Sequence, residues 1–290
     1  MPELLITGGH SFIGGAVRAR MEEASPEFHC TAVSLRGDGW KAMDLSRYDA
    51  VLHCAGIAHV SPDPSLADAY RTVNFELTRD LAQKAKADGC SHFIFLSSMI
   101  VFGQAARAGE RRLISPDTPP APVNAYGQSK LDAENALRAL EDDGFRAAIL
   151  RPPMVYGDGC KGNYNALRSL ARKLPIFPEY ENRRSMLYVE NLAELIAQIV
   201  LSGASGTFHP SDGQPRSVSD IVRQICLCHG KNMRFSRALA PLVTLAGGRG
   251  VVRRAFGDMD YDASMPDFPG NYRRFSFEEG IRRTEGDEKW

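Results

Sequence analysis

The first half of the chain alternates short β-rich runs with helical stretches, and this alternation restricts the fold more than any other feature. Such a pattern predicts a parallel sheet whose strands are joined by crossover helices. One predicted helix, residues 64–88, has apolar residues every four positions and is followed by Gly89, which favours a helix end. The predicted strands are residues 4–7, 30–35, 50–54, 92–97 and 147–150.

A glycine-rich loop, residues 6–15, joins the first predicted strand to the first predicted helix. At such a junction, free backbone amides and the positive end of a helix bind the pyrophosphate of a dinucleotide. A side chain at Gly8 would block this approach, whereas Gly14 lets the helix pack closely on the strand. The alternative is a tight turn without a ligand. The candidate cofactor contacts in the loop are Gly8, His10, Ser11, Phe12 and Ile13, of which the last two also look like core residues.

The residues after the second predicted strand bear on which dinucleotide is bound. An acidic residue there accepts hydrogen bonds from the ribose of NAD, whereas an arginine favours the 2′-phosphate of NADP. Arg36 follows the strand directly, and Asp38 comes two residues later. We therefore expect NAD or NADP as cofactor, with NADP slightly favoured, although Arg36 is equally well a solvated loop charge.

Tyr126 and Lys130 lie four residues apart at the start of a predicted helix, so both side chains share one helix face. A free phenol titrates near pH ~10, and a neighbouring ammonium lowers the pKa of an acidic group. Together with an oxidised nicotinamide, Lys130 is expected to bring Tyr126 towards the working range of a proton carrier. The strand 92–97 is followed by Ser98, and the carboxyl ends of such strands are where open α/β sheets bind ligands.

The composition excludes several other classes of function. Lysine plus arginine number 35 and aspartate plus glutamate 35, so the overall charge attracts neither nucleic acid nor an anionic membrane. No apolar run approaches the roughly 20 residues that cross a bilayer. The six cysteines form no CxxC pair, and Cys226, Cys228 and His229 lack a second pair of metal ligands, so no metal site is expected. These features predict a soluble, cytoplasmic protein.

Several motifs together resemble the extended short-chain dehydrogenase/reductase family, in particular its NAD-dependent epimerase/dehydratase group, and the likeness covers nearly the whole chain. They are the loop 7–14, Asp44-Leu45, His53-Cys54-Ala55-Gly56, Asn74, Ser98, Tyr126 with Lys130, and the segments 151–157 and 184–192. The resemblance implies an α/β fold, with a Rossmann-type doubly wound parallel sheet and a smaller C-terminal α/β substrate-binding domain. It also implies Ser98, Tyr126 and Lys130 as catalytic residues. Further implied cofactor contacts are Asp44, Leu45, Cys54, Ala55, Gly56, Asn74, Tyr126, Lys130 and Pro153.

The sequence departs from this family pattern at three places. Ser11 stands where the family usually has the middle glycine of the loop, so a small side chain lies near the expected pyrophosphate. Gly56 replaces a common alanine, which we expect to be harmless. Met99 and Ile100 occupy the place of the Asp-Glu pair of sugar 4,6-dehydratases, so no acid is at hand to expel the C6 hydroxyl. This last departure argues against dehydratase activity.

The second half is similar to bacterial members that act on UDP-linked N-acetyl or 6-deoxy sugars in surface-polysaccharide pathways, especially at residues 161–164 and 182–185. The resemblance implies a UDP-hexose 4-epimerase or a 4-keto sugar reductase, with hydride transfer at the sugar C4. Ser98, Asn163 and Arg184 are the expected substrate contacts, with Arg184 favoured over Arg183 for the diphosphate. The alternative is a catalytically silent NAD(P)-binding regulatory or interaction protein.

The change of pattern after Pro153 predicts two parts. We expect a cofactor-binding domain over residues 1–156, to which residues 187–205 return, and a substrate-binding domain over 157–186 and 206–290. In these later segments a strand is predicted at 187–189, and helices at 191–201, 217–228 and 239–245. The basic stretch 247–254 either closes over the substrate or faces solvent. A homodimer through the helices 64–88 and 125–140 is expected from the resemblance, unless these helices pack only within the chain.

Overall fold

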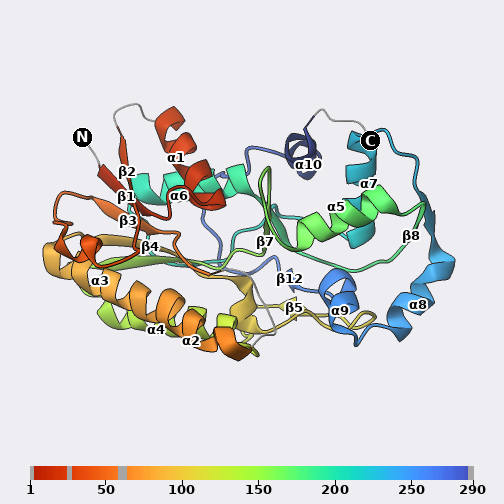
Figure 1. Ribbon diagram of the computed structural model, residues 1–290, viewed down its shortest axis with the longest axis horizontal. Helices are drawn as coiled ribbons and strands as arrows, with labels where there is room; N and C mark the ends of the chain where they lie inside the picture. The colour runs from red at the N-terminus through yellow and green to blue at the C-terminus, as the bar shows by residue number, and fades with distance from the viewer. Residues whose placement is uncertain (1–2, 25–27, 58–63, 287–290) are drawn as a thin grey trace.

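The computed structural model describes residues 3–24, 28–57 and 64–286, so the outer ends of the two predicted domains lie outside it. A parallel six-stranded sheet, in the order β10-β6-β4-β3-β1-β2, forms one half of the molecule (Figure 1). Its inner strands are almost entirely buried, as expected for a parallel sheet covered on both faces. The strands are β1 (Glu3–Thr7), β2 (His29–Val33), β3 (Ala50–His53), β4 (His92–Leu96), β6 (Arg146–Leu150) and β10 (Gly206–Phe208).

The five predicted strands are confirmed, and the α/β fold with a doubly wound parallel sheet is as expected. The sixth strand, β10, pairs with β6 through residues that we had assigned to the substrate-binding domain. The predicted boundary after residue 205 is therefore wrong. A three-residue strand at the sheet edge has too few residues to show an alternating pattern in the sequence.

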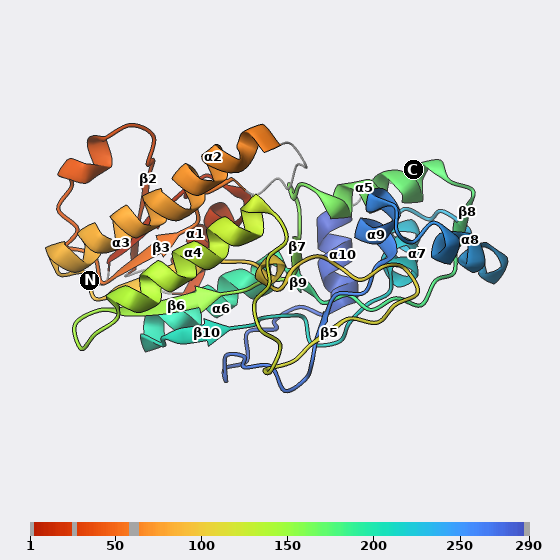
Figure 2. The same cartoon turned by 90° about the horizontal axis from the view of Figure 1, so that it is seen from below.

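Helices cover both faces of this sheet (Figures 1 and 2). On one face, α1 (Phe12–Ala24) packs against α6 (Val189–Ser202), so the segment after residue 187 returns to the sheet. On the other face lie α3 (Leu77–Asp88) and α4 (Ala125–Leu140). Apolar side chains of α1 and α6 pack with the strands in one buried core, and those of α3 and α4 pack with the strands in another. Helix α4 begins where the Asn124 side chain accepts a hydrogen bond from the Gly127 amide, at 2.7 Å.

The predicted helix over residues 64–88 is not one regular helix. It consists of a 3₁₀ turn (Pro64–Leu66), α2 (Ala67–Tyr70), a π-helical stretch (Arg71–Glu76) and α3. Gly89 ends it with a left-handed backbone, at φ 96°, as predicted. Such π-helical turns are rare and frequently mark functional sites, and this one carries the buried side chain of Asn74. Apolar periodicity does not distinguish a π turn from an α turn.

The second half of the molecule is a separate cluster of helices and short strands with its own apolar core. The predicted helix 217–228 is confirmed as α7, and Ser217 and Asp220 form a capping box at its start. The stretch 247–254, expected as a connector, is largely helical. The elements are β5 (Leu113–Ile114), β7 (Met154–Tyr156), α5 (Asn163–Lys173), β8 (Ile176–Pro178), β9 (Met186–Tyr188), α7 (Val218–Cys228), β11 (Arg234–Ser236), α8 (Ala240–Leu245), α9 (Gly250–Phe256), β12 (Asp260–Tyr261) and α10 (Phe277–Glu285). Short 3₁₀ turns are Gly39–Ala42, Met99–Phe102 and Arg237–Leu239.

Within the described ranges, none of the helices combines the length and apolar character needed to cross a bilayer. The same residues contain no group of three or more His, Cys, Asp or Glu side chains arranged to hold a metal ion.

Candidate active site

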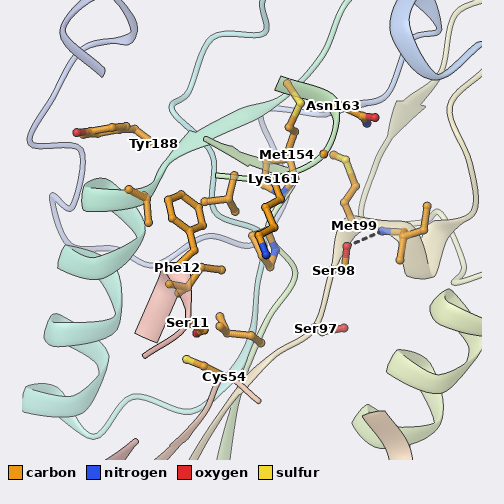
Figure 3. Close-up of a pocket in the computed structure, with 18 of the residues that line it drawn as sticks. Ser11, Phe12, Cys54, Ser97, Ser98, Met99, Met154, Lys161, Asn163 and Tyr188 are labelled. Carbon is orange, nitrogen blue, oxygen red and sulfur yellow. Dashed lines mark hydrogen bonds between the residues drawn. The ribbon is translucent and has the colours of Figure 1, made fainter. Parts of the chain in front are cut away.

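A cleft of about 2110 Å³ runs from the start of α1 to helix α9, past the carboxyl ends of the sheet strands. Figure 3 shows Ser11 and Phe12 on one side of this cleft and Ser97 and Ser98 across from them, with Lys161 and Asn163 near its outer part. The predicted site residues that line it are His10, Ser11, Phe12, Ile13, Cys54, Gly56, Ser98, Tyr126, Lys130, Pro153, Asn163 and Arg184. The fold thus brings together residues from both halves of the chain.

The glycine loop has the geometry of an anion-binding helix start. The Ser11 hydroxyl accepts a hydrogen bond from the Gly14 amide at 3.2 Å and so caps α1. The first-turn amides of Phe12 and Ile13 have no acceptor within the helix, and both residues line the cleft. The Ser11 hydroxyl therefore binds the Gly14 amide, and the amides of Phe12 and Ile13 remain for a pyrophosphate. The donors present fit a dinucleotide, with its pyrophosphate at this helix end.

Two glycines of the loop are required by close backbone packing. A side chain at Gly14 would lie 2.4 Å from the Gly8 carbonyl oxygen, so the expected tight contact between helix and strand is present. Gly8 has φ 71°, and a side chain there would meet the backbone of Ala55 at 3.0 Å. The need for glycine at position 8 therefore comes from the chain after β3 and from the left-handed backbone, and not only from the ligand.

The residues predicted at the adenosine end do not line the cleft described above. Arg36 is exposed, and Asp38 forms an exposed ion pair with Lys41 at 2.7 Å. Asp44 is also exposed, but Leu45 is buried in the core, and its amide donates to Asp88 at 2.9 Å. Leu45 therefore has a packing role in the core, and the adenine contact of Asp44 and Leu45 stays a prediction.

The segment after β3 is held by Asn74. The Asn74 amide group accepts from the Ile57 backbone amide at 2.8 Å and donates to the Ile57 carbonyl at 3.0 Å. Its nitrogen also donates to the Ser129 hydroxyl at 3.3 Å. Asn74 is fully buried and does not line the cleft, so it positions this segment, and its contact with the cofactor stays a prediction.

Replacing Gly56 by alanine is expected to destabilise the protein by about 1–3 kcal/mol, the usual cost of overpacking. The new methyl group would lie 2.9 Å from the Asn74 side-chain oxygen, which its hydrogen bonds hold in place. The family's common alanine thus has no room here. Urea unfolding measures the change, with Gly39→Ala as control because nothing lies within 4 Å of that position. Equal stability of the two variants would contradict the packing argument.

Ser98 and Tyr126 both line the cleft near the carboxyl end of β4, and the Ser98 hydroxyl acts to lower the pKa of Tyr126. The Ser98 hydroxyl also accepts from the Ile100 amide at 3.3 Å, the bond drawn in Figure 3. The preceding Ser97 points elsewhere and donates to the carboxylate of Glu134. Burial raises the pKa of Tyr126 to about 12, and the Ser98 hydroxyl only partly offsets this. The phenol is therefore protonated at neutral pH, and the lowering of its pKa expected from Lys130 together with an oxidised nicotinamide stays a prediction.

Lys130 lies one turn after Tyr126 on α4, and its charged side chain is buried. Its ammonium donates to the Leu96 carbonyl at 2.8 Å and lies 4.7 Å from the centre of the Phe95 ring. Burial lowers the pKa of Lys130 to about 8. The carbonyl and the ring stabilise the ammonium, which also has access to the cleft.

The buried ammonium has a cost in stability that depends on pH. Between the lowered pKa of about 8 and the ordinary 10.5, the unfolded chain binds the proton that the folded chain releases. The contribution of Lys130 to the free energy of unfolding therefore rises with pH across this window and is lowest below pH 8. At pH 7 the free energy of unfolding of Lys130→Met is expected to exceed that of the wild type by up to about 3 kcal/mol. Each unit of pKa shift corresponds to ~1.4 kcal/mol. The gap should close towards pH 10.5.

Urea unfolding of both proteins at pH 7 and pH 10 measures this gap. Lys173→Met, at an exposed position, is the control and should show no such dependence on pH. A less stable Lys130→Met at pH 7 would contradict the expected cost.

The outer part of the cleft carries the predicted substrate contacts. Arg184 is buried, and its guanidinium donates to the carbonyls of Arg254 and Gly257 at 3.0 and 2.9 Å. Burial lowers the pKa of Arg184 to about 10, so it remains charged at neutral pH. Arg183, the less favoured candidate, is bound to Asp260 at 3.0 Å and does not line the cleft. Asn163 and Lys161 are exposed at the start of α5 and line the cleft.

Several lining residues were missed at the sequence level. Four of them are the arginines Arg253, Arg254, Arg274 and Arg283. The last two pair with Glu23 and Glu190 at the rim, whereas the first two come from the basic stretch 247–254, whose charge was the one available signal. Others are apolar, among them Met99, Ile100, Met154 and Met259. Their sequence separation hides their common location.

Comparisons with known proteins agree with this geometry. The chain is 34% identical over 197 residues to UDP-glucose 4-epimerase of Vibrio cholerae, covering 65% of this chain and 60% of the relative. It is 28% identical over 212 residues to N-acetyl-alpha-D-glucosaminyl-diphospho-ditrans,octacis-undecaprenol 4-epimerase of Escherichia coli O157:H7, covering 70% of this chain and 61% of the relative. The chain thus spans about three fifths of the length of these two proteins.

A solved structure has the same fold. UDP-glucuronic acid 4-epimerase from Bacillus cereus, in complex with NAD, superposes with a TM-score of 0.72 at 18% identity, covering 98% of this chain and 97% of that one. The model of the NAD dependent epimerase/dehydratase family matches residues 4–208, which include the glycine loop, Ser98, Tyr126 and Lys130. The chain therefore belongs to the NAD dependent epimerase/dehydratase family, the family that its motifs resemble.

Proposed function

We propose that the protein is an NAD(P)-dependent nucleotide-sugar epimerase or reductase. The reaction is hydride transfer at C4 of a UDP-linked hexose, or of a 6-deoxy or N-acetyl sugar, in bacterial surface-polysaccharide synthesis. The observation that carries this proposal is that Ser98, Tyr126, Lys130 and residues of the glycine loop line one cleft. The 4-epimerases among its relatives support the same reaction centre.

The chemistry follows from the protonation state of these groups. The dinucleotide, when bound, supplies or accepts the hydride. Tyr126, with its pKa raised to about 12, holds a proton at neutral pH and donates it to a carbonyl oxygen at C4. Ser98 donates a hydrogen bond to the same oxygen and so holds it in place. In the opposite direction Tyr126 must be in its phenolate form to take the hydroxyl proton, and the charges of Lys130, one helical turn away, and of an oxidised nicotinamide would together stabilise that form.

The surroundings of Ser98 support a restricted set of sugars. Met99 and Ile100 stand where a dehydratase needs carboxylates, and Met154 and Met259 line the same cleft. Apolar side chains cannot protonate a leaving hydroxyl, so we do not expect 4,6-dehydratase activity. They favour a methyl group at C6, which makes a 6-deoxy sugar the preferred substrate within the proposed class.

The diphosphate is assigned to the outer part of the cleft. The buried, charged guanidinium of Arg184 already bonds two carbonyls through one nitrogen. An arginine has five N–H donors, so others remain for an anion. Asn163 is placed to bind a further oxygen from the first turn of α5. A nucleotide diphosphate is therefore the expected carrier of the sugar.

A panel of UDP- and dTDP-linked sugars, with NAD or NADPH, tests the proposal. We expect a product altered only at C4, identified by mass and NMR. Turnover of 4-keto-6-deoxy sugars with NADPH indicates a reductase, whereas NAD retained through purification indicates an epimerase. Dinucleotide binding without turnover on any sugar would instead support the silent regulatory protein. A purified protein that binds neither dinucleotide would end the proposal.

A further inference from the structure

The hairpin of α8 and α9, residues 240–256, exposes large apolar side chains that the proposed reaction does not use. Leu242 is 61% exposed, Leu245 84% and Val251 72%. These three residues lie within ten positions of the chain, on two short helices joined by a tight loop. Val243 and Phe256 anchor the hairpin to the apolar core from its inner side. Single exposed apolar residues are ordinary, but a group of them marks an interaction site.

The same region carries a one-sided charge. Residues 221–257 contain no aspartate or glutamate and seven lysines and arginines, in a chain with 35 of each sign. On the hairpin, Arg249 and Arg254 are exposed, and Arg237 precedes it. Neighbouring acids offset part of this charge: Glu179 pairs with Arg237 at 3.5 Å and with Arg223 at 3.2 Å, and Asp220 pairs with Arg223 at 3.0 Å. Arg249 and Arg254 form no ion pair among the described residues, so the surface stays basic.

The hairpin also has a defined place in the molecule. In Figures 1 and 2, α8 lies at the end remote from the large sheet. Helix α9 reaches back to the cleft, which Gly250, Arg253 and Arg254 line. One side of the hairpin thus borders the cleft, whereas Leu242, Leu245, Arg249 and Val251 are exposed and do not line it.

We propose that the α8–α9 hairpin docks the protein onto the surface of an anionic phospholipid bilayer. Arginines near such a surface are attracted by its negative potential, at about 1 kcal/mol each, and protruding leucines insert at the boundary between headgroups and acyl chains. The charge complementarity of an acid-free, basic segment favours an anionic surface over a second copy of this chain, whose same patch would repel it. Because no described helix spans a bilayer, this association is peripheral. It revises the expectation, drawn from the overall charge balance, that no membrane takes part.

Sedimentation of the full chain with lipid vesicles tests the proposal without any sugar or dinucleotide, so its outcome is independent of the proposed reaction. We expect binding to vesicles of phosphatidylcholine mixed with phosphatidylglycerol, weak binding to phosphatidylcholine alone, and release by salt. Leu245→Ser should reduce the partition coefficient by about tenfold, the effect of inserting one leucine side chain. Arg249→Gln, which leaves the cleft untouched, should weaken only the salt-sensitive part.

Leu201→Ser is the matched control, because Leu201 is 56% exposed at the end of α6, on the sheet half of the molecule. It should bind vesicles as the wild type does. Lack of binding to anionic vesicles, or equal weakening by Leu201→Ser and Leu245→Ser, would overturn the proposal. So would a wild-type dimer in sedimentation velocity that Leu245→Ser converts to a monomer, because the patch would then be covered by a second copy.

Discussion

Replacing Tyr126 by phenylalanine is expected to lower kcat by roughly 10²–10⁴, the usual contribution of a positioned acid or base. The change removes one oxygen atom, and with it the transferable proton and the group whose pKa Ser98 acts to lower. The ring itself remains, so its contact with Tyr70, with ring centres 5.7 Å apart, is preserved. Dinucleotide binding should therefore be retained while turnover is lost. Steady-state kinetics on a substrate found in the sugar panel, with dinucleotide titration, measures both effects.

Tyr180→Phe is the matched control, because Tyr180 and Tyr126 are each 8% exposed. Tyr180 does not line the cleft, so its variant should keep normal kcat. Undiminished turnover of Tyr126→Phe would show that another group carries the proton. A loss of dinucleotide binding as large as the loss of turnover would assign Tyr126 to cofactor binding instead.

Replacing Glu134 by alanine is expected to lower the free energy of unfolding by about 3–5 kcal/mol, the cost of breaking a buried ion pair. The carboxylate of Glu134 is fully buried and accepts from Arg151 at 3.0 and 2.6 Å and from Arg138 at 2.9 Å. It also accepts from Ser97, next to the proposed catalytic serine. Although burial acts to raise it, the pKa of Glu134 stays below its ordinary value because of these partners. Without the carboxylate, Arg151 is left buried and unpaired.

Urea unfolding measures this loss, with two further variants as controls. Asp132→Ala changes a carboxylate on the same helix that, among the described residues, is hydrogen-bonded to Gln128, and it should cost little. The double variant Glu134→Leu with Arg151→Leu removes both buried charges and should recover part of the stability. A Glu134→Ala protein within 1 kcal/mol of the wild type, as ~1 kcal/mol is typical of ordinary substitutions, would contradict this role of the pair.

The same ion pair shows where prediction from the sequence stops. Glu134 lies one turn beyond Lys130 on a helix predicted from its apolar pattern, and nothing in that pattern distinguishes Glu134 from an exposed glutamate. Its burial depends on Arg151 and Ser97, which follow two different strands of the sheet. Asn74 is a similar case. Its hydrogen bond to the Ile57 amide is made from a π-helical turn, which apolar periodicity does not reveal.

The raised pKa of Tyr126 and the lowered pKa of Lys130 could not be predicted from the sequence either. The spacing of Tyr126 and Lys130 places them on one helix face, but their titration depends on burial, because removing a charge from water costs more than a neighbouring charge returns. The apolar lining of the cleft likewise joins Met99 and Ile100 to Met154 and Met259, far apart along the chain. Distance along the chain conceals such neighbours.

By itself, the sequence determined five of the six strands of the large sheet, all except β10. It also determined the glycine loop at the start of α1 and the helix that carries Tyr126 and Lys130. These features follow from local periods and backbone requirements, which neighbouring residues express. Only the tertiary structure decided that β10 completes the sheet, that Gly56 must leave room for Asn74, and that arginines of α9 line the cleft. Such features depend on which distant segments meet in the folded chain, and this is set by the packing of the whole molecule.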